Sequence, residues 1–368
     1  MKTSAELHIP SLDGIRGIAA LMVFVSHAAL PRLIPGGFGV TVFFFLSGYL
    51  ITTLLRLEHE GTGRVSLRDF YLRRVLRILP PFYTVLLLAL ALTAGGLLAG
   101  DLRLWPVATQ LGHLANYWAI RHGTDGTPLG TAVYWSLAVE EHFYLVFPFL
   151  FILLQRWLPG SWRVQGRILL GLCAGVLAWR LWLVFVDHAP LDRTYLASDT
   201  RIDSILFGCA LAVGANPVLD PLRGPVALWK KVLLPLGMLL LLSTFLFRAP
   251  WYRETLRYTL QGIGLTPLFV MAMREPRWWP FRWLNLRWVR HVGLLSYSLY
   301  LVHHVVLYLC EHHLPSWHWT ARAVLSLAAS LAIAQAIHRF IEKPCARLRR
   351  RLAHATWLKG NAAGAPVR

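Results

Sequence analysis

Two ionisable residues of the first apolar run, Arg16 and His27, lie eleven positions apart. In an α-helix this spacing separates them by about 16 Å along the axis, and because eleven residues make close to three turns, both side chains lie on one face. A cation at one end and an imidazole that titrates near neutral pH at the other suit a reaction whose donor and acceptor approach from opposite sides. Asp13 is the third ionisable residue of this run. The alternative, a snorkelling arginine and an interfacial histidine, stays open.

A basic cluster follows the second apolar run, in the segment SLRDFYLRRVLRILPPFY. Arg73, Arg74 and Arg77 fall within about one helical turn. Guanidinium groups bind phosphate in a bidentate manner, so the cluster is a candidate clamp for a phosphorylated donor. The alternative is a topology signal that contacts anionic lipid headgroups. We expect Pro80-Pro81 to fix the start of the third span.

A second polar segment, TAVYWSLAVEEHFYLVFPF, combines carboxylates with aromatic residues at a predicted outer helix end. Its candidates are Trp135, Ser136, Glu140, Glu141, His142 and Tyr144. Glu140 and Tyr144 are four residues apart and therefore share a helix face. Adjacent carboxylates point in different directions, so we expect only one of the two to enter the bundle.

Three later segments also place polar groups at span ends. SDTRIDSILFG contains Arg201 and Asp203, and SYSLYLVHH contains tyrosines and a histidine pair. Glu342 lies at the predicted cytoplasmic end of the last span. An Arg–Asp pair inside a helix bundle serves either chemistry or structure, and both interpretations stay open.

Several other chemistries are disfavoured. Ser47 lacks the GxSxG sequence of a nucleophile elbow. The histidine pairs His303-His304 and His312-His313 lack a usual metal-ligand spacing, so we expect no metal. The four cysteines form no CxxC motif, which argues against a zinc site and a disulfide framework.

The elements that must position these residues are membrane helices. Of the 368 residues, 56% are hydrophobic and 15% charged, and the mean hydropathy is +0.50. An ordinary soluble domain is less apolar and has about 25% charged residues. The net charge of +19 would suggest nucleic acid in a soluble protein, but here the basic residues are scattered over short loops, so we exclude nucleic acid as a partner.

The apolar runs predict an all-α, polytopic transmembrane helix bundle of about ten spans. We expect spans at residues 11–30, 38–56, 78–99, 133–155, 168–187, 201–215, 232–247, 255–273, 292–310 and 320–340. Residues 104–120 contain Pro106, His113 and Asn116, and are expected to form a re-entrant or interfacial helix or an eleventh span.

The distribution of basic residues favours ten spans with both termini in the cytoplasm. In that arrangement 25 Lys and Arg residues face the cytoplasm and 6 face outward, in agreement with the positive-inside rule. Counting 104–120 as a span would place the basic C-terminal segment outside. Cleavage of the first run as a signal peptide after Ala28 is disfavoured, because Asp13 and Arg16 interrupt it. We expect a transmembrane domain over 1–345 and a basic, flexible cytoplasmic tail over 346–368.

The order of these motifs resembles the acyltransferase-3 family of integral-membrane O-acyltransferases. The matching segments are SLDGIRGIAALMVFVSH, FFFLSGYLIT, RDFYLRRVLRILPPFY, YWSLAVEEHFYLVFP, DTRIDSILFG, SYSLYLVHH and IEKP. The resemblance implies transfer of an acyl group, usually acetyl, from cytoplasmic acyl-CoA to a hydroxyl of a glycan or related acceptor. Acyl-CoA would be a co-substrate, with no bound cofactor.

The resemblance also maps residues of the family onto this sequence. The Arg and His of its first span correspond to Arg16 and His27, and the Glu of its WSL segment corresponds to Glu140. Its basic pair corresponds to Arg73 and Arg74 or Arg77, with the register left open. We hypothesise that His27 is the general base and that Glu140 orients it. Arg73, Arg74 and Arg77 would bind the phosphates of acyl-CoA. Glu342 matches a late Glu-x-Pro motif of the family. We add as supporting residues Asp13, Trp135, Ser136, Tyr144, Arg201 and Asp203.

The acceptor stays open at the level of sequence. The 368 residues include no extracytoplasmic hydrolase-like domain of the SGNH type, so we expect a stand-alone enzyme acting on an exopolysaccharide or lipopolysaccharide unit at the bacterial inner membrane. Alternatives are the sugar of a secreted metabolite such as a macrolide, a covalent acyl relay through Tyr or Ser, or a transporter or flippase of a lipid-linked glycan. A transporter would be expected to show internal repeats, and none is visible.

Overall fold

The computed structural model describes residues 9–28 and 35–352. Within these ranges the protein has no β-strand, only an isolated bridge between Gly100 and Pro128, so the predicted all-α class is confirmed. The helices are α1 (Pro10–Ala28), α2 (Gly36–Thr62), α3 (Leu67–Ala94), α4 (Leu104–Leu111), α5 (Ala115–His122), η1 (Ala132–Tyr134), α6 (Trp135–Trp157), α7 (Trp162–Phe185), α8 (Leu191–Leu196), α9 (Ser198–Gly214), α10 (Val226–Leu228), η2 (Trp229–Leu233), α11 (Leu234–Leu246), α12 (Pro250–Glu254), α13 (Leu256–Arg274), η3 (Arg282–Asn285), α14 (Arg287–His313), α15 (Trp319–Ile337) and η4 (His338–Glu342).

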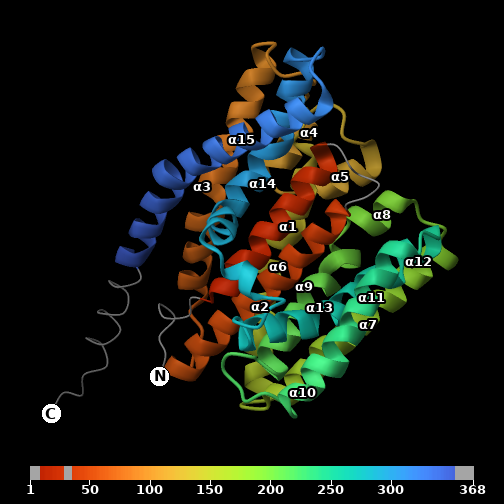
Figure 1. Cartoon of the computed structure of the whole chain (residues 1–368), viewed down its shortest axis with the longest axis vertical. Helices are drawn as coiled ribbons and strands as arrows, with labels where there is room; N and C mark the ends of the chain where they lie inside the picture. Colours follow the sequence, from red (N-terminus) through yellow and green to blue (C-terminus); the bar gives the residue numbers. More distant parts are fainter. Residues whose placement is uncertain (1–8, 29–34, 353–368) are drawn as a thin grey trace.

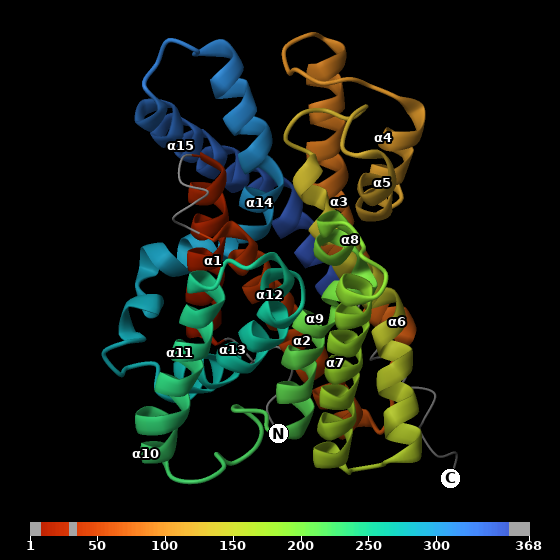
Figure 2. The same ribbon diagram turned by 90° about the vertical axis from the view of Figure 1, so that its right-hand side faces the viewer.

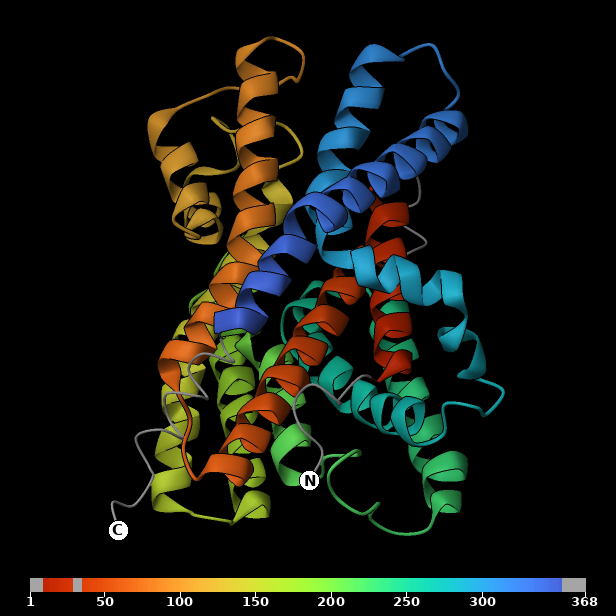
Figure 3. The same cartoon turned by 90° about the vertical axis from the view of Figure 1, so that its left-hand side faces the viewer.

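Seven helical segments of the described residues are long and apolar enough to cross a membrane. They are α2, α3, Ala132–Trp157, α7, Val226–Leu246, α14 and Trp319–Leu352. Helices α1, α9 and α13 occupy three further expected spans but fall outside this set. Figures 1 and 3 show the long helices packed against one another, with α15 oblique to the long axis of the molecule. The count of ten crossings stays a prediction.

Residues 104–120 do not form one continuous helix. They fold into α4 and α5, of eight residues each, with a break at Gly112–Leu114. Eight helical residues extend about 12 Å, which is too short to cross a bilayer of about 30 Å. Figure 2 shows this pair beside the upper part of α3, where the Tyr83 hydroxyl donates to the Leu111 carbonyl at 3.0 Å. Neither helix could cross a bilayer by itself, which supports the arrangement favoured by the basic residues, in which 104–120 is not a span.

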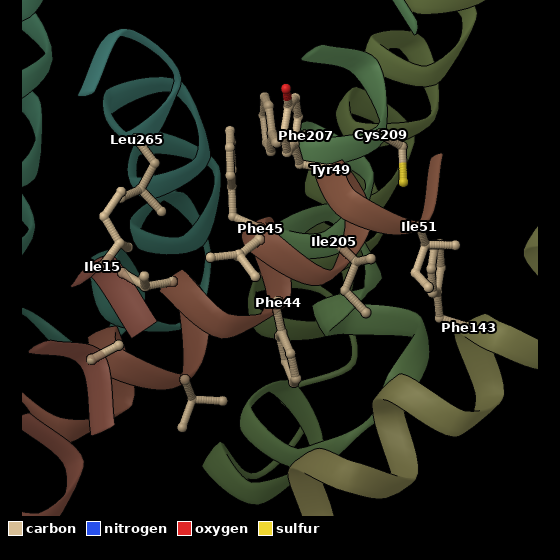
Figure 4. Packing of buried hydrophobic residues seen from close by; sticks show 14 of the residues in the cluster. Ile15, Phe44, Phe45, Tyr49, Ile51, Phe143, Ile205, Phe207, Cys209 and Leu265 are labelled. Atoms are coloured by element: carbon tan, nitrogen blue, oxygen red, sulfur yellow. The ribbon is translucent and has the colours of Figure 1, made fainter. Parts of the chain in front are cut away.

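Helix α9 lies at the centre of the bundle. It packs against α2, α7 and α13, and 14 of its 17 residues are buried. Figure 4 shows Ile205, Phe207 and Cys209 of α9 among the core residues of α2 and α6. Because neighbouring helices surround α9, it can carry charged residues that a lipid-facing helix could not.

Glycines bring two helix pairs into close contact. A Cβ atom on Gly293 of α14 would overlap the carbonyl oxygen of Asp13 in α1. In the same way, a Cβ on Gly48 of α2 would overlap the Ile205 carbonyl, and one on Gly208 of α9 would overlap the Phe45 carbonyl. Small residues permit such close approach of membrane helices. The α1–α14 crossing sets the position of Arg16 and His27 relative to α14.

Helices extend past two expected boundaries. Pro80 and Pro81 lie inside α3, which begins at Leu67 with Ser66 as its N-cap. The last helical segment continues to Leu352, so the start of the expected flexible tail is helical. The remainder of that tail, 353–368, lies outside the described residues.

Candidate active site

One cluster of polar residues joins α1 to α14 through histidines. The Nδ1 atom of His27 lies 3.0 Å from the Nε2 atom of His303, and the His27 ring stacks on the His304 ring with centroids 4.4 Å apart. His303 is buried, whereas His27 is exposed. The expected partner of His27 was Glu140, but the hydrogen bond that the structure gives His27 goes to His303. The carboxylate of Glu140 instead accepts from Tyr144.

The hydrogen bonds of this cluster assign the protons on the two rings. The Nδ1 atom of His303 lies 2.7 Å from the carbonyl oxygen of Tyr300, which can only accept, so this nitrogen carries the proton. In a neutral ring, Nε2 of His303 then has a lone pair and accepts from Nδ1–H of His27. The Nε2 atom of His27 is thereby left with a lone pair. The arrangement fits a general base held in one tautomer.

A second polar cluster gathers around Glu140 of α6. The charges of Arg77, Arg16 and Arg74 all act on the Glu140 carboxyl. Arg74 is buried, with its guanidinium 5.9 Å from the centre of the Tyr144 ring. Arg16 also forms an ion pair with Asp13 at 3.7 Å. Helices α1, α3 and α6 thus bring together residues that the sequence predicted to act jointly.

Within this second cluster, three groups form a hydrogen-bonded chain. The Tyr144 hydroxyl donates to Glu140 at 3.2 Å and lies 2.5 Å from the hydroxyl of Ser47. Since the Tyr144 proton goes to the carboxylate, Ser47 donates to Tyr144. Ser47 therefore belongs to the polar centre of the molecule, a placement that the small-residue pattern of its helix did not reveal.

The three arginines of the basic cluster have different surroundings. Arg73 forms an ion pair with Glu58 at 2.6 Å. Arg74 and Arg77, three residues apart on one face, act on Glu140, and the Arg77 side chain is exposed. The sequence left open which arginines belong together, and the structure places Arg74 and Arg77 near Arg16.

Ser136 and Tyr300 form a further polar link between α6 and α14. Their hydroxyl oxygens lie 2.7 Å apart, and the Tyr300 hydroxyl donates to the Val133 carbonyl at 2.8 Å. The Tyr300 ring lies 5.5 Å from the His303 ring. The sequence indicated Tyr300 and His303 as polar residues of a span but not their contacts with α1 and α6, since these depend on helices distant in sequence.

Arg201 and Asp203 do not pair with each other. Asp203 forms a fully buried ion pair at 2.6 Å with Arg180 of α7, a residue that the sequence analysis passed over. Arg201 is fully buried inside a cage of aromatic rings, whose members are Phe44, Trp135, Tyr195 and Tyr258. The nearest, Tyr258, has its ring centre 3.8 Å from the guanidinium carbon. The contacts of Arg201, Trp135 and Asp203 therefore stabilise the helix core. None of these three residues is a partner of His27.

Glu342 connects the end of α15 to α14. Its carboxylate accepts from the Ser298 hydroxyl at 2.5 Å and lies 2.6 Å from Nδ1 of His338. Both His338 and Glu342 belong to the π-helical turn η4. Tyr297, next to Ser298, experiences the charges of Glu140, Glu141 and Glu342.

Among the described residues, no group of three or more His, Cys, Asp or Glu side chains is arranged to hold a metal ion.

With this geometry established, comparison with known proteins identifies the family. Residues 9–339 match the acyltransferase domain that the ordered motifs resembled. The chain belongs to the acyltransferase-3 family. The family identification from the seven motifs is therefore confirmed, and the two polar clusters are features of a membrane acyltransferase domain.

The curated relatives of this acyltransferase are O-acetyltransferases by name. It is 29% identical over 356 residues to the peptidoglycan O-acetyltransferase OatA of Listeria monocytogenes, covering 92% of this chain and 56% of that protein. It is 30% identical to a putative O-acetyltransferase of Staphylococcus aureus, covering 92% and 57%. A putative peptidoglycan O-acetyltransferase of Bacillus subtilis, YrhL, is 29% identical, with 93% and 56% covered. The chain thus spans little more than half the length of these relatives. No solved structure matches the acyltransferase.

Proposed function

We propose that this protein is a membrane O-acetyltransferase that moves an acetyl group from cytoplasmic acyl-CoA to a glycan hydroxyl on the opposite side of the membrane. One observation carries the proposal: within an acyltransferase domain, α1 joins an arginine in a basic cluster to a histidine in a histidine cluster. The two residues are eleven positions, or about 16 Å, apart along the helix. The two clusters can therefore serve a donor and an acceptor that arrive from opposite sides.

At the donor end, Arg74 and Arg77 bind the phosphates of acyl-CoA. Arg77 is exposed, and no hydrogen bond or ion pair engages its side chain within the described residues, so it is available to a ligand. Arg73 contributes less, because Glu58 already neutralises it. Arg16 lies beyond them and polarises the thioester carbonyl as the pantetheine arm enters the bundle.

At the acceptor end, Nε2 of His27 takes the proton of the acceptor hydroxyl. The hydroxyl oxygen then attacks the thioester carbonyl carbon, the C–S bond breaks, and the thiolate of CoA leaves. The proton on His27 passes to that thiolate, so the products are the acetyl ester and free CoA. His303 accepts a hydrogen bond from His27 throughout and stabilises its cationic form. For direct transfer the reacting atoms must come within about 3.5 Å, so the pantetheine arm has to thread along α1.

The acceptor is a cell-envelope glycan. The names of the relatives in Listeria monocytogenes and Bacillus subtilis make peptidoglycan the first acceptor to test. The exopolysaccharide and lipopolysaccharide units expected from the sequence are the next acceptors to test. The protein lies in the bacterial inner membrane, with ten crossings and both termini in the cytoplasm, an orientation supported by the excess of basic residues on one side.

Transfer of labelled acetyl groups tests this proposal. Membrane vesicles that contain the protein receive [14C]acetyl-CoA and, in separate arms, peptidoglycan, lipopolysaccharide, exopolysaccharide or a glycosylated macrolide. In the wild type, alkali-labile label is expected on an envelope glycan. In His27→Ala, the rate of labelling should be about 10²- to 10⁴-fold lower, as for loss of a general base. His291→Ala, an exposed histidine at the start of α14, is the matched control and should retain the rate. A wild-type rate in His27→Ala would refute the role of His27, and label on none of the glycans would refute the function.

A further inference from the structure

A groove outside the two clusters lies between α7, α9 and the loop that follows α9. Its wider part has a volume of about 530 Å³ and is bordered by Arg163 and Arg223. A narrower part of about 180 Å³ continues from it and is lined by Arg163, Arg167 and apolar side chains. The two parts share Arg163, Gly214 and Arg223, so they form one continuous space. Helices α7 and α9 run side by side in Figure 2.

Both parts of the groove are bordered by unneutralised positive charge. Arg163 and Arg167 are four residues apart on α7, both are exposed, and neither side chain has a hydrogen bond or ion pair with another described residue. Arg223 uses one guanidinium nitrogen to donate to the Gly214 carbonyl, which anchors it at the rim. The acidic lining residue Asp220 is engaged by Arg56 at 2.6 Å. Burial alone would raise the pKa of Asp220, but the hydrogen bonds from Arg56 lower it, so the carboxylate stays ionised and paired.

Apart from these arginines, the narrow part is lined mostly by apolar side chains and small residues at the periphery of the bundle. Leu170, Phe207 and Leu211 line it, and Leu170 is exposed. Only 22% of the membrane-spanning window of α7 is buried, so this helix presents most of its surface outward. A groove with cationic groups at one end and an apolar, outward-facing continuation matches a ligand with an anionic head and a hydrocarbon chain.

We infer that the groove binds one anionic phospholipid, with its phosphate between Arg163, Arg167 and Arg223 and an acyl chain along Leu170, Phe207 and Leu211. A nucleotide is a poorer match, because the faces of Trp162 are already in contact with other groups. The Arg56 guanidinium lies 4.7 Å from the centre of its ring, and the ring of Phe151 stacks on it at 6.4 Å. The bound lipid joins α7 to the loop after α9. The inference depends on the membrane setting of the protein and not on the proposed acetyl transfer.

Native mass spectrometry of the detergent-purified full chain tests this inference. Phosphatidylglycerol and phosphatidylcholine with identical acyl chains are titrated separately. The wild type is expected to bind one phosphatidylglycerol roughly 30-fold more tightly than phosphatidylcholine, and Arg163→Gln/Arg167→Gln should lose this preference. Arg64→Gln/Arg68→Gln removes two exposed arginines with the same spacing elsewhere and is the matched control, which should keep the preference. An equal loss in the control would overturn the inference in favour of general surface charge.

Competition experiments separate the possible sources of the phosphate. Inorganic phosphate and glycerophosphoglycerol, which lack acyl chains, should displace phosphatidylglycerol only at concentrations at least about 100-fold higher than a short-chain phosphatidylglycerol. Displacement at similar concentrations would identify a simple anion site, and displacement by micromolar coenzyme A would assign the groove to the acyl donor. Leu170→Trp fills the apolar part at an exposed position without changing charge. It should weaken phosphatidylglycerol binding, which provides the test if the double arginine variant does not fold.

Discussion

At the scale of single residues, the hydrogen bond between His27 and His303 determines which nitrogen is free to react. The Tyr300 carbonyl fixes the proton on His303, and His303 in turn fixes the proton on His27. In the proposed mechanism, this chain of two hydrogen bonds would make His303 a positioning residue for His27. His27 would then act without the Glu140 contact that the sequence suggested.

Substitutions of His303 should separate positioning from packing. His303→Leu removes the acceptor for His27 Nδ1–H and should lower kcat about 10- to 100-fold with little change in KM for acetyl-CoA, because the donor cluster is distant. His303→Gln places a carbonyl oxygen near the former Nε2 position and should recover most of the rate. Steady-state acetyl transfer in vesicles measures both parameters. Equal losses in the two variants would instead indicate a packing role.

The arginines of α3 should differ in their effect on the donor. Arg77→Gln is expected to raise KM for acetyl-CoA about 10-fold, since a charge-assisted hydrogen bond contributes about 1.5–3 kcal/mol. Arg73→Gln should change it much less, because Glu58 already pairs with Arg73. Initial rates at varied acetyl-CoA concentration give both values. Similar KM values for the two variants would contradict the assignment of Arg77 to the phosphates.

The sequence predicted which side chains share a helix face better than it predicted contacts between helices. Glu140 and Tyr144 lie on one face of α6 and are hydrogen-bonded, because spacing along a helix determines which side chains share a face. The partner of His27, however, is 276 positions away, and the partner of Asp203 is Arg180 on another helix. Such pairs depend on how helices cross, which the local pattern of one sequence does not encode.

At the scale of helices, the crossing of α1 and α14 controls the geometry of the histidine cluster. The two backbones touch where Gly293 meets the Asp13 carbonyl and where Gly17 meets the Val289 carbonyl. Gly48 of α2 and Gly208 of α9 allow the same close approach between another pair of helices. The position of Pro80-Pro81 inside α3 was missed, since prolines usually mark a helix start but membrane helices tolerate them internally.

Gly293→Ala should disturb function through this crossing. The added methyl group has no space, so α1 and α14 must separate, with a cost of about 1–3 kcal/mol for overpacking. Thermal unfolding in detergent should therefore shift to lower temperature, and acetyl transfer should fall as the His27–His303 hydrogen bond lengthens. Gly171→Ala on α7, where nothing lies within 4 Å of the new Cβ, is the control. It is expected to be neutral or slightly stabilising, since Ala favours helix over Gly. An unchanged unfolding temperature and rate in Gly293→Ala would contradict the importance of this contact.

At the scale of the whole molecule, a shell of apolar helices surrounds a charged interior. The buried Arg201 and the Asp203 partner of Arg180 lie on α9, and Tyr258 and Thr259 of α13 contact these arginines. Helices α9 and α13, together with α1, are the three expected spans that fall short on length or apolarity. Sequence hydropathy identified all ten segments as helical because even these three are rich in apolar residues. Hydropathy alone could not show which helices are screened from lipid, because this depends on how the other helices pack around them.

The orientation of the bundle can be tested by cysteine labelling. In a background without the four native cysteines, Arg64→Cys, Thr124→Cys and Trp317→Cys each place one thiol at an exposed position. In intact cells a membrane-impermeant maleimide should label positions 124 and 317 but not 64, and all three after permeabilisation. Protection of position 124 would mean that the α4–α5 segment crosses the membrane, and labelling of position 64 would reverse the predicted orientation.

The stretch of α1 between the two polar clusters is lined by buried apolar side chains. Ala19, Ala20, Val23 and Phe24 are buried, and Ala20 packs with Leu295 and Leu299 of α14. Hydrophobic constrictions close channels because they exclude water. Apolar packing of this kind opposes a continuous file of water between the two clusters, and with it the leakage of ions along α1.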